Sequence, residues 1–138
     1  MNVKVYEHVK FLKSLLIKEE SFEYLQMAHL KTSAIYWSLT AAILLNSFDE
    51  IYPEEKRKDV LSFLERVYNR KDGGFAGNEG ANDSHLLFTL SAIQIMTILL
   101  GRGIYPPWFN LERTVNCKPL LYLYLILILI LLLIIPCF

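Results

Sequence analysis

Two kinds of helical pattern alternate along the chain. Residues 5–16 carry apolar side chains at every third or fourth position, with charged residues between them, and residues 56–69 repeat this arrangement after a predicted loop at 49–55. Both segments are predicted to be amphipathic surface helices. Residues 35–45 and 85–100 contain no Asp, Glu, Lys or Arg and are apolar on nearly every side, so both are predicted to be buried helices.

Capping residues mark the ends of the two buried segments. Thr32 or Ser33 is expected to cap the first and Ser84 the second, because hydroxyl oxygens accept hydrogen bonds from the free amides of a first helical turn. Gly101 and Gly103 are expected to end the second segment in a left-handed cap.

The two buried segments look like duplicates of each other. At an offset of 51 residues they align with matched size and polarity. The aligned pairs are Ser33 with Ser84, Trp37 with Phe88, Ser38 with Thr89, Leu39 with Leu90, Thr40 with Ser91 and Ala41 with Ala92. A repeated hairpin of one surface helix and one buried helix predicts an all-α fold of two concentric shells, in which the buried helices form the inner ring. Two inner helices are too few to close that ring.

The composition changes abruptly near the end of the sequence. Lys118 is the last charged residue, and residues 120–135 consist only of Leu, Ile and Tyr. As a helix this segment would extend ~24 Å, marginally enough for a hydrocarbon core of about 30 Å. Arg113 and Lys118 precede it, as a cytosolic boundary of a membrane segment requires. We therefore divide the chain into a helical domain, 1–112, and a hydrophobic low-complexity tail, 113–138.

Charge and cysteine usage exclude several functions. The 14 basic residues balance the 14 acidic ones, so nucleic acid is not indicated as a partner. Cys117 and Cys137 are far apart and have no histidines at zinc-ligand spacing, which predicts neither a disulfide framework nor a metal site. The first 18 residues carry charges throughout and lack the apolar region of a secretory signal, so a cytoplasmic protein is expected.

The loop at 71–83 contains four glycines, but it lacks the Gly-Lys-Ser or Gly-Lys-Thr of a phosphate-binding loop and no strand pattern precedes it. Gly73 or Gly74 is instead expected to supply a positive φ angle, and Phe75 to fill the core. His85 could be a metal ligand, an acid–base group or a brace for this loop, and the absence of a second ligand nearby favours the brace. No catalytic residue is assigned.

Three stretches resemble protein prenyltransferase β subunits. They are residues 33–40 (Ser-Ala-Ile-Tyr-Trp-Ser-Leu-Thr), 73–77 (Gly-Gly-Phe-Ala-Gly) and 83–95 (Asp-Ser-His-Leu-Leu-Phe-Thr-Leu-Ser-Ala-Ile-Gln-Ile). The last is most similar to the Rab geranylgeranyltransferase (type II) β subunits, whereas the Gly-Gly-Phe turn is less specific because it recurs in terpene cyclases and farnesyl enzymes. The resemblance covers about residues 6–103 and implies a partial α-α barrel, similar to the prenyltransferase and terpenoid cyclase toroid.

The resemblance also implies a function. In that family an apolar funnel holds the isoprenoid of geranylgeranyl diphosphate, and zinc activates the acceptor cysteine of a Rab GTPase that a Rab escort protein presents. The partner is a prenyltransferase α subunit. Ser33, Tyr36, Trp37 and Leu90 fall where the family builds the deep end of its lipid pocket, and a residue as small as Ser33 would leave space for a twenty-carbon chain. Simple core packing of these four residues stays open as the alternative.

The family's zinc ligands and diphosphate-binding basic residues have no counterpart in this sequence. We therefore expect a truncated and inactive copy of the transferase subunit, with the segment after about residue 111 translated from non-coding sequence or a shifted frame. One alternative is a small tail-anchored membrane protein whose helical repeat is an interaction module. Another is a non-catalytic fragment that docks an α subunit through its exposed helices.

Overall fold

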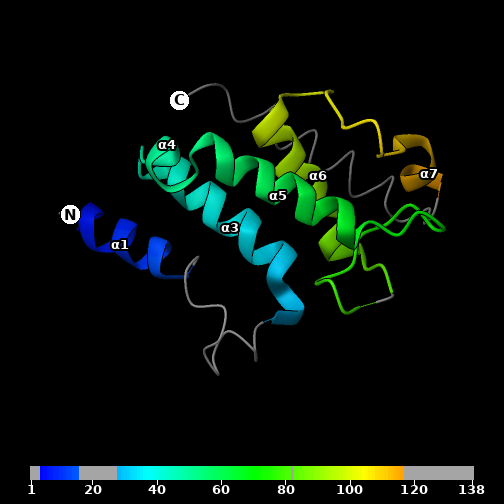
Figure 1. Cartoon of the computed structure of the whole chain (residues 1–138), viewed down its shortest axis with the longest axis horizontal. Coiled ribbons are helices and arrows are strands. Elements are labelled where there is room, and N and C mark those ends of the chain that lie inside the picture. Colours follow the sequence, from blue (N-terminus) through cyan, green and yellow to red (C-terminus); the bar gives the residue numbers. More distant parts are fainter. Residues whose placement is uncertain (1–3, 16–27, 82, 117–138) are drawn as a thin grey trace.

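The computed structural model describes residues 4–15, 28–81 and 83–116, and within these ranges its regular structure is helical (Figure 1). The one β-type pairing in the described part is an isolated antiparallel bridge between Tyr68 and Phe75. In chain order the elements are α1 (Val5–Leu15), the 3-10 turn η1 (Ala28–Leu30), α3 (Lys31–Leu44), α4 (Phe48–Ile51), α5 (Glu54–Val67), α6 (Leu86–Leu100) and α7 (Leu111–Asn116). The predicted helical class is confirmed.

Helices α3 and α6 lie side by side and form the most extensive helix contact of the structure. Ser33 Oγ lies 3.0 Å from Ser91 Oγ, and Gln94 Nε2 donates a hydrogen bond of 3.2 Å to the Tyr36 hydroxyl. Both pairs join residues that are 58 positions apart. Because the spacing is the same at both points, the two helices run parallel, as the inner helices of two successive hairpins should.

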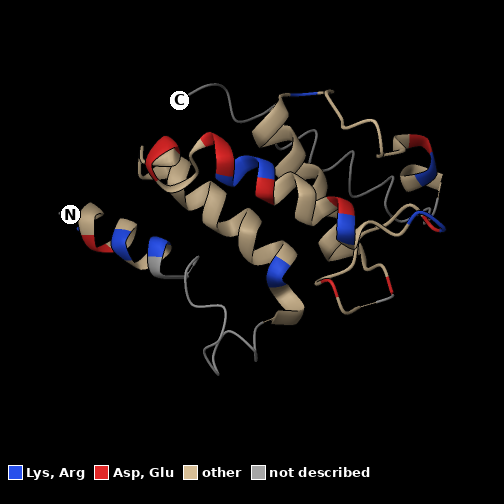
Figure 2. Ribbon diagram, in the orientation of Figure 1, with Lys and Arg blue, Asp and Glu red and all other residues tan. Residues whose placement is uncertain are grey.

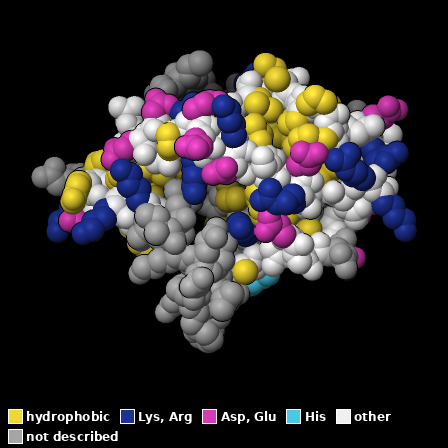
Figure 3. All heavy atoms as spheres, in the orientation of Figure 1, with side chains coloured by type: hydrophobic (Ala, Val, Ile, Leu, Met, Phe, Trp, Pro, Cys, Tyr) yellow, Lys and Arg dark blue, Asp and Glu magenta, His cyan; other side chains and the backbone are white. Residues whose placement is uncertain are grey.

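The outer layer consists of α1 and α5, and their amphipathic patterns explain their positions. Helix α5 packs against α6 with a stripe at helical spacing, made of Val60, Phe63, Leu64 and Val67. Its charged residues lie on the opposite side, where Figure 3 shows basic and acidic side chains next to each other. Helix α1 contacts α3 and α4, with Val9 and Leu12 among its buried residues.

The prediction that α3 and α6 are buried on every side is wrong for one side of each helix. Leu39 of α3 is completely buried, yet Trp37 and Leu44 are 52% and 81% exposed. On α6, Leu87 is 45% exposed. Each helix packs against the other and against the outer layer, and no element of the described ranges covers the remaining side.

Two predicted caps are also corrected. Helix α3 begins at Lys31, so Thr32 and Ser33 lie inside its first turn with buried side chains rather than at its N-cap. At α6 the N-cap is His85, whose Nδ1 accepts a hydrogen bond of 3.3 Å from the Leu87 amide. Ser84 lies one residue before this N-cap, and its hydroxyl donates to Asp72 Oδ2 at 2.6 Å.

The ends of the helices agree with the sequence in part. Gly101 is the C-cap of α6, but its φ of 101° and ψ of 163° lie outside the left-handed helical region, so the predicted left-handed cap is not formed there. Gly103 follows with a positive φ of 77°. Two short helices were not predicted. Helix α4 begins just before the expected loop at 49–55, and α7 crosses the predicted domain boundary between residues 112 and 113.

The predicted apolar segment at 120–135 lies outside the described residues, as does everything beyond Asn116. Within the described ranges, no helix combines the length and the apolar character that crossing a bilayer requires. The predicted membrane segment and the predicted division at residue 112 both stay predictions.

Candidate functional site

The open side of α3 and α6 is an uncharged, largely apolar surface. Trp37 and Leu44 are two turns apart on α3, and Leu87 and Gln94 are two turns apart on α6, so each pair lies along one side of its helix. We call the surface formed by these four residues the inner face. Figure 2 shows that α6 carries no charged residue and that the charge on α3 is confined to Lys31 at its start.

The structure brings the four predicted lipid-binding residues to this pair of helices, but at different depths. Trp37 lies on the inner face, and Tyr36 is half-buried with its hydroxyl bonded to Gln94. Ser33 is completely buried, and Leu90 is 7% exposed. Ser33 and Leu90 therefore lie behind the surface, while Tyr36 and Trp37 reach it.

Sequence reasoning missed three residues of the inner face, Leu44, Leu87 and Gln94. A signal for them was present, since Leu44 follows Trp37 by seven positions and Gln94 follows Leu87 by seven, which puts each pair on one helix side. The side of an uncharged helix that remains exposed depends on how the neighbouring helices pack against it. Residue spacing alone therefore could not show which of these side chains would be exposed.

The polar groups of α6 are satisfied within the protein. The hydroxyls of Thr89, Ser91 and Thr97 each donate to the carbonyl four residues earlier at 2.9 Å. With its hydroxyls bonded to the backbone and no charged side chain, the helix offers a ligand mainly aliphatic contacts. This arrangement suits an apolar chain rather than a polar substrate.

Behind α3, Tyr52 is completely buried, and its hydroxyl faces that of Ser38. Among the described residues, neither hydroxyl has any other hydrogen-bond partner. Burial raises the pKa of Tyr52 above its ordinary value, and the Ser38 hydroxyl partly opposes this rise. The phenol therefore stays protonated through the physiological range and supplies no base.

The glycine loop has the two features predicted for it. Gly73 has a φ of 81°, and Phe75 is completely buried. The ring centroid of Phe75 lies 5.0 Å from that of Tyr68, 5.9 Å from that of Phe109 and 6.4 Å from that of Trp108. The positive φ angle and the core-filling role predicted for this loop are both confirmed.

The predicted brace by the His85 side chain is wrong, because the backbone of this residue rather than its imidazole contacts the glycine loop. The His85 amide donates to the Phe75 carbonyl at 3.0 Å, while the imidazole caps α6. The Phe75 amide donates in turn to Thr89 Oγ1 at 3.0 Å. The loop is therefore fixed to the first turn of α6.

The amides around the Gly73–Gly74 turn already have acceptors within the protein, which argues against a phosphate cradle there. Gly73 donates to the Asn69 carbonyl, Gly74 to Asp72 Oδ1 and Ala76 to the Val67 carbonyl, at 2.8, 2.8 and 3.0 Å. A phosphate site needs several free amides that point at the anion. The sequence-based exclusion of a phosphate-binding loop agrees with this geometry.

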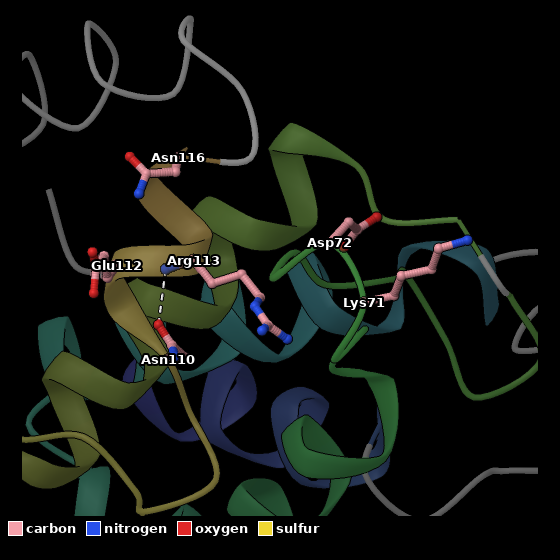
Figure 4. A pocket seen from close by; sticks show the side chains of 6 residues that line it. All are labelled: Lys71, Asp72, Asn110, Glu112, Arg113 and Asn116. Carbon is pink, nitrogen blue, oxygen red and sulfur yellow. Dashed lines mark hydrogen bonds between the residues drawn. The ribbon is translucent and has the colours of Figure 1, made fainter.

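An open hollow of about 470 Å³ lies between the glycine loop and α7 (Figure 4). Its lining residues are Lys71, Asp72, Asn110, Glu112, Arg113 and Asn116. Figure 4 shows the Arg113 side chain directed toward the glycine loop, where its guanidinium donates to the Arg70 carbonyl. The Asp72 carboxylate accepts from Gly74 and Ser84. Arg113 thus joins α7 to the start of the loop and Asp72 is bonded within it, so we assign the hollow a structural role.

Zinc does not fit the described part of the chain. In residues 4–15, 28–81 and 83–116, no three His, Cys, Asp or Glu side chains gather as a metal site requires. Cys117 and Cys137 lie outside these ranges. We therefore derive no chemical step through a metal ion.

The model of the prenyltransferase α-α toroid domain matches residues 3–117 of this chain. The parallel inner helices, the outer amphipathic layer and this match together show that the chain belongs to that family. Its relatives include geranylgeranyl transferase type-2 β subunits, so the resemblance found in the sequence is confirmed.

The similarity to these subunits covers much of this chain but little of each relative. The chain is 41% identical to subunit beta 1 of Arabidopsis thaliana and 40% identical to the subunit of Saccharomyces cerevisiae, each over 90 residues. It is 37% identical over 95 residues to the probable subunit of Dictyostelium discoideum. These stretches are 65% to 69% of this chain and 26% of each relative. The chain thus spans about a quarter of the length of the curated relatives it matches.

Proposed function

We propose that this chain supplies the first hairpins of a geranylgeranyl transferase type-2 β subunit and that its inner face contacts the isoprenoid. The observation that carries the proposal is the exposure of Trp37 and Leu87 on two parallel helices without a charged residue on α6. A monomer surface that exposes large apolar side chains on adjacent helices is typical of a binding site. An isoprenoid is apolar and extended, which matches a surface that continues along two helices.

Each of the four predicted residues has a role in this proposal. Tyr36 and Trp37 touch the isoprenoid directly, and burial of its hydrocarbon surface supplies affinity at roughly 25 cal/mol per Å². Ser33 and Leu90 lie behind them and set the depth of the pocket. A small side chain at Ser33 leaves more room than an aromatic one would, which favours a longer isoprenoid.

The remaining parts of the activity come from outside the described residues. We propose a prenyltransferase α subunit as the partner, geranylgeranyl diphosphate as the lipid donor, and Rab GTPases bound to Rab escort protein as the acceptors, in the cytoplasm. Because zinc does not fit the described residues, we expect these residues by themselves to bind lipid without transferring it.

Photochemical labelling tests the proposed lipid contact. The purified chain would be irradiated with a geranylgeranyl diphosphate analogue that carries a benzophenone on its isoprenoid, and the labelled peptides would be identified by mass spectrometry. We expect labelling on α3 and α6, reduced ~10-fold in Trp37→Ser, the change that about 1.4 kcal/mol of lost contact produces.

Tyr6→Ser provides the matched control, because Tyr6 is also an exposed aromatic residue, 75% accessible, but lies on α1. This variant should label as the wild type does. Equal loss of labelling in both variants, or labelling confined to α1 and α5, would refute the assignment of the inner face to lipid binding.

A further inference from the structure

We propose that Gln94 is a positioning residue that holds the Tyr36 ring clear of Ser33 and thereby keeps the inner face open to a twenty-carbon isoprenoid. The inference rests on the proposed function and adds to it a residue that decides which chain length fits. It starts from the hydrogen bond of 3.2 Å that Gln94 Nε2 donates to the Tyr36 hydroxyl. Tyr36 precedes Trp37, so this bond lies next to a residue to which we assign direct lipid contact.

Two hydrogen bonds between side chains cross from α3 to α6 at successive helical turns. The first joins Ser33 to Ser91 and is buried, since both residues are at most 3% exposed. The second joins Tyr36 to Gln94, one turn further along each helix, and both of these residues are half-buried. The second pair therefore lies nearer to the surface of the inner face than the first.

The second hydrogen bond determines the direction in which the Tyr36 side chain extends. Side chains of an α-helix lean toward its N-terminus, so an unbonded Tyr36 ring would cover the preceding turn, which contains Ser33. The bond to Gln94 directs the hydroxyl sideways instead, to a partner at the same level of the parallel helix α6. The space beside the small Ser33 side chain thereby stays available to a longer isoprenoid.

The chemistry of a carboxamide limits what Gln94 can do at this surface. It carries no charge that would neutralise a diphosphate, and it does not titrate in the physiological range, so it supplies neither an acid nor a base. The hydrocarbon of an isoprenoid offers it no hydrogen-bond partner. Gln94 therefore acts through Tyr36, and the bond between them lowers the cost of placing an amide on an apolar surface.

Gln94 differs in this respect from the hydroxyl-bearing residues of its own helix. Thr89, Ser91 and Thr97 donate to carbonyls of α6, whereas Gln94 donates to a side chain of α3. Thr97 is also half-buried and lies one turn after Gln94. Because its hydroxyl is bonded to the Ile93 carbonyl within the helix, Thr97 provides a matched control for a polar group on α6.

Competition labelling of the full chain with diphosphates of two lengths tests the proposal. Farnesyl diphosphate, with fifteen carbons, and geranylgeranyl diphosphate, with twenty, would each displace the benzophenone analogue from the wild type and from Gln94→Leu, which removes the amide and keeps most of the bulk. We expect Gln94→Leu to weaken the binding of geranylgeranyl diphosphate ~3- to 10-fold, the range of one neutral hydrogen bond, and that of farnesyl diphosphate less than ~2-fold. Thr97→Val should change neither.

Tyr36→Phe completes a double-mutant cycle, since it removes the hydroxyl and keeps the ring. It should weaken the binding of geranylgeranyl diphosphate by the same factor as Gln94→Leu does. The double variant should lose no more than either single variant, because both substitutions remove the same bond. Additive losses, an unchanged preference in Gln94→Leu, or equal weakening of both diphosphates would overturn the positioning role.

Failure of the proposed function gives a different result. If the inner face binds lipid but Gln94 does not position Tyr36, labelling of α3 and α6 stays sensitive to Trp37→Ser, while Gln94→Leu leaves the preference between the two lengths unchanged. If the inner face does not bind lipid, the wild type itself shows no labelling there that either diphosphate displaces. That outcome would refute both the proposed function and the role of Gln94.

A second measurement needs no lipid. An amide proton that Gln94 donates to Tyr36 exchanges slowly with water, so NMR should record its exchange at least ~3-fold faster in Tyr36→Phe than in the wild type or Thr97→Val. Circular dichroism would establish that the described helices persist in every variant. Equal exchange rates in the wild type and Tyr36→Phe would mean that the bond does not hold the two side chains together, and the inference would be wrong.

Discussion

Helices α5 and α6 are neighbours of nearly equal length, 14 and 15 residues, but they present opposite surfaces. Helix α5 packs one stripe against the core and covers its other sides with charges, several of them paired, such as Arg66 with Glu79 at 2.5 Å. Helix α6 has no charged residue and bonds its hydroxyls to its own carbonyls. The difference indicates that α5 meets water on one side, whereas α6 has no charged side that water would favour.

The largest effect should come from placing a charge on each helix. Ala92 of α6 is completely buried, so Ala92→Asp would bury an unpaired carboxylate and is expected to lower the free energy of unfolding by about 3–5 kcal/mol. Ser62→Asp on the exposed side of α5 should change it by less than about 0.5 kcal/mol. Urea unfolding followed by circular dichroism measures both. If both variants lose similar free energy of unfolding, α6 tolerates a charge as well as the exposed side of α5 does, and the comparison fails.

A smaller effect is expected from Thr32→Val at the start of α3. Thr32 Oγ1 is buried and donates to the Ala76 carbonyl at 2.8 Å, so removing the hydroxyl leaves a buried acceptor unsatisfied and should cost about 1–3 kcal/mol. Thr40→Val is the matched control, because Thr40 donates only to the Tyr36 carbonyl within its own helix. If urea unfolding gives equal losses for both substitutions, the contact between α3 and the glycine loop contributes nothing of its own.

The next prediction concerns the pH dependence of stability and tests Tyr52, which is buried between α3 and α4. Burial raises the pKa of Tyr52 above about 10, so the unfolded chain loses this proton at a lower pH than the folded chain does. The stability that depends on the neutral phenol is therefore full below pH ~10 and is lost as the pH rises toward the folded-state pKa. We expect Tyr52→Phe to reduce this loss in urea titrations above pH ~10, with Tyr6→Phe as the exposed control. If the free energy of unfolding falls equally steeply with pH in the wild type and in Tyr52→Phe, the phenol of Tyr52 does not cause the loss.

The smallest effect should follow from Glu79→Gln, which removes the ion pair with Arg66. Both side chains are about half exposed, so the pair is expected to contribute less than about 1 kcal/mol and to weaken as salt screens it. Thermal unfolding at low and high salt would measure the difference. A large loss of thermal stability that salt does not change would show that the Arg66–Glu79 pair has a structural role beyond a solvent-exposed ion pair.

The sequence predicted the elements whose pattern extends over several turns. The stripe of α5, including Val60 and Leu64, is periodic over its full length and identified the helix before its neighbours were known. Helix α4 has 4 residues and α7 has 6, too few for any periodicity to be visible. Their existence depends on contacts from distant parts of the chain, such as the bond from Thr114 to the Gly73 carbonyl.

The candidate site was predictable only in part, for a related reason. The repeat identified α3 and α6 as a pair, and the family resemblance selected Ser33, Tyr36, Trp37 and Leu90, whose lipid contacts stay a prediction. An uncharged helix gives no sign of which side remains open, because charge is the feature that usually distinguishes the two sides. The hydrogen bond from Ser84 to Asp72, which lies 12 residues earlier, was equally hidden.

The contact between the start of α3 and the glycine loop has a consequence for the order of events during synthesis. Thr32 donates to the Ala76 and Gly77 carbonyls, and a side chain at Gly77 would collide with the His29 carbonyl, so this junction closes only around residues made much later. A ribosome that has released residues 28–44 has therefore released a helix whose first turn lacks its final partners. The first hairpin matures only when the loop of the second has emerged, which couples the folding of successive repeats as the nascent chain lengthens.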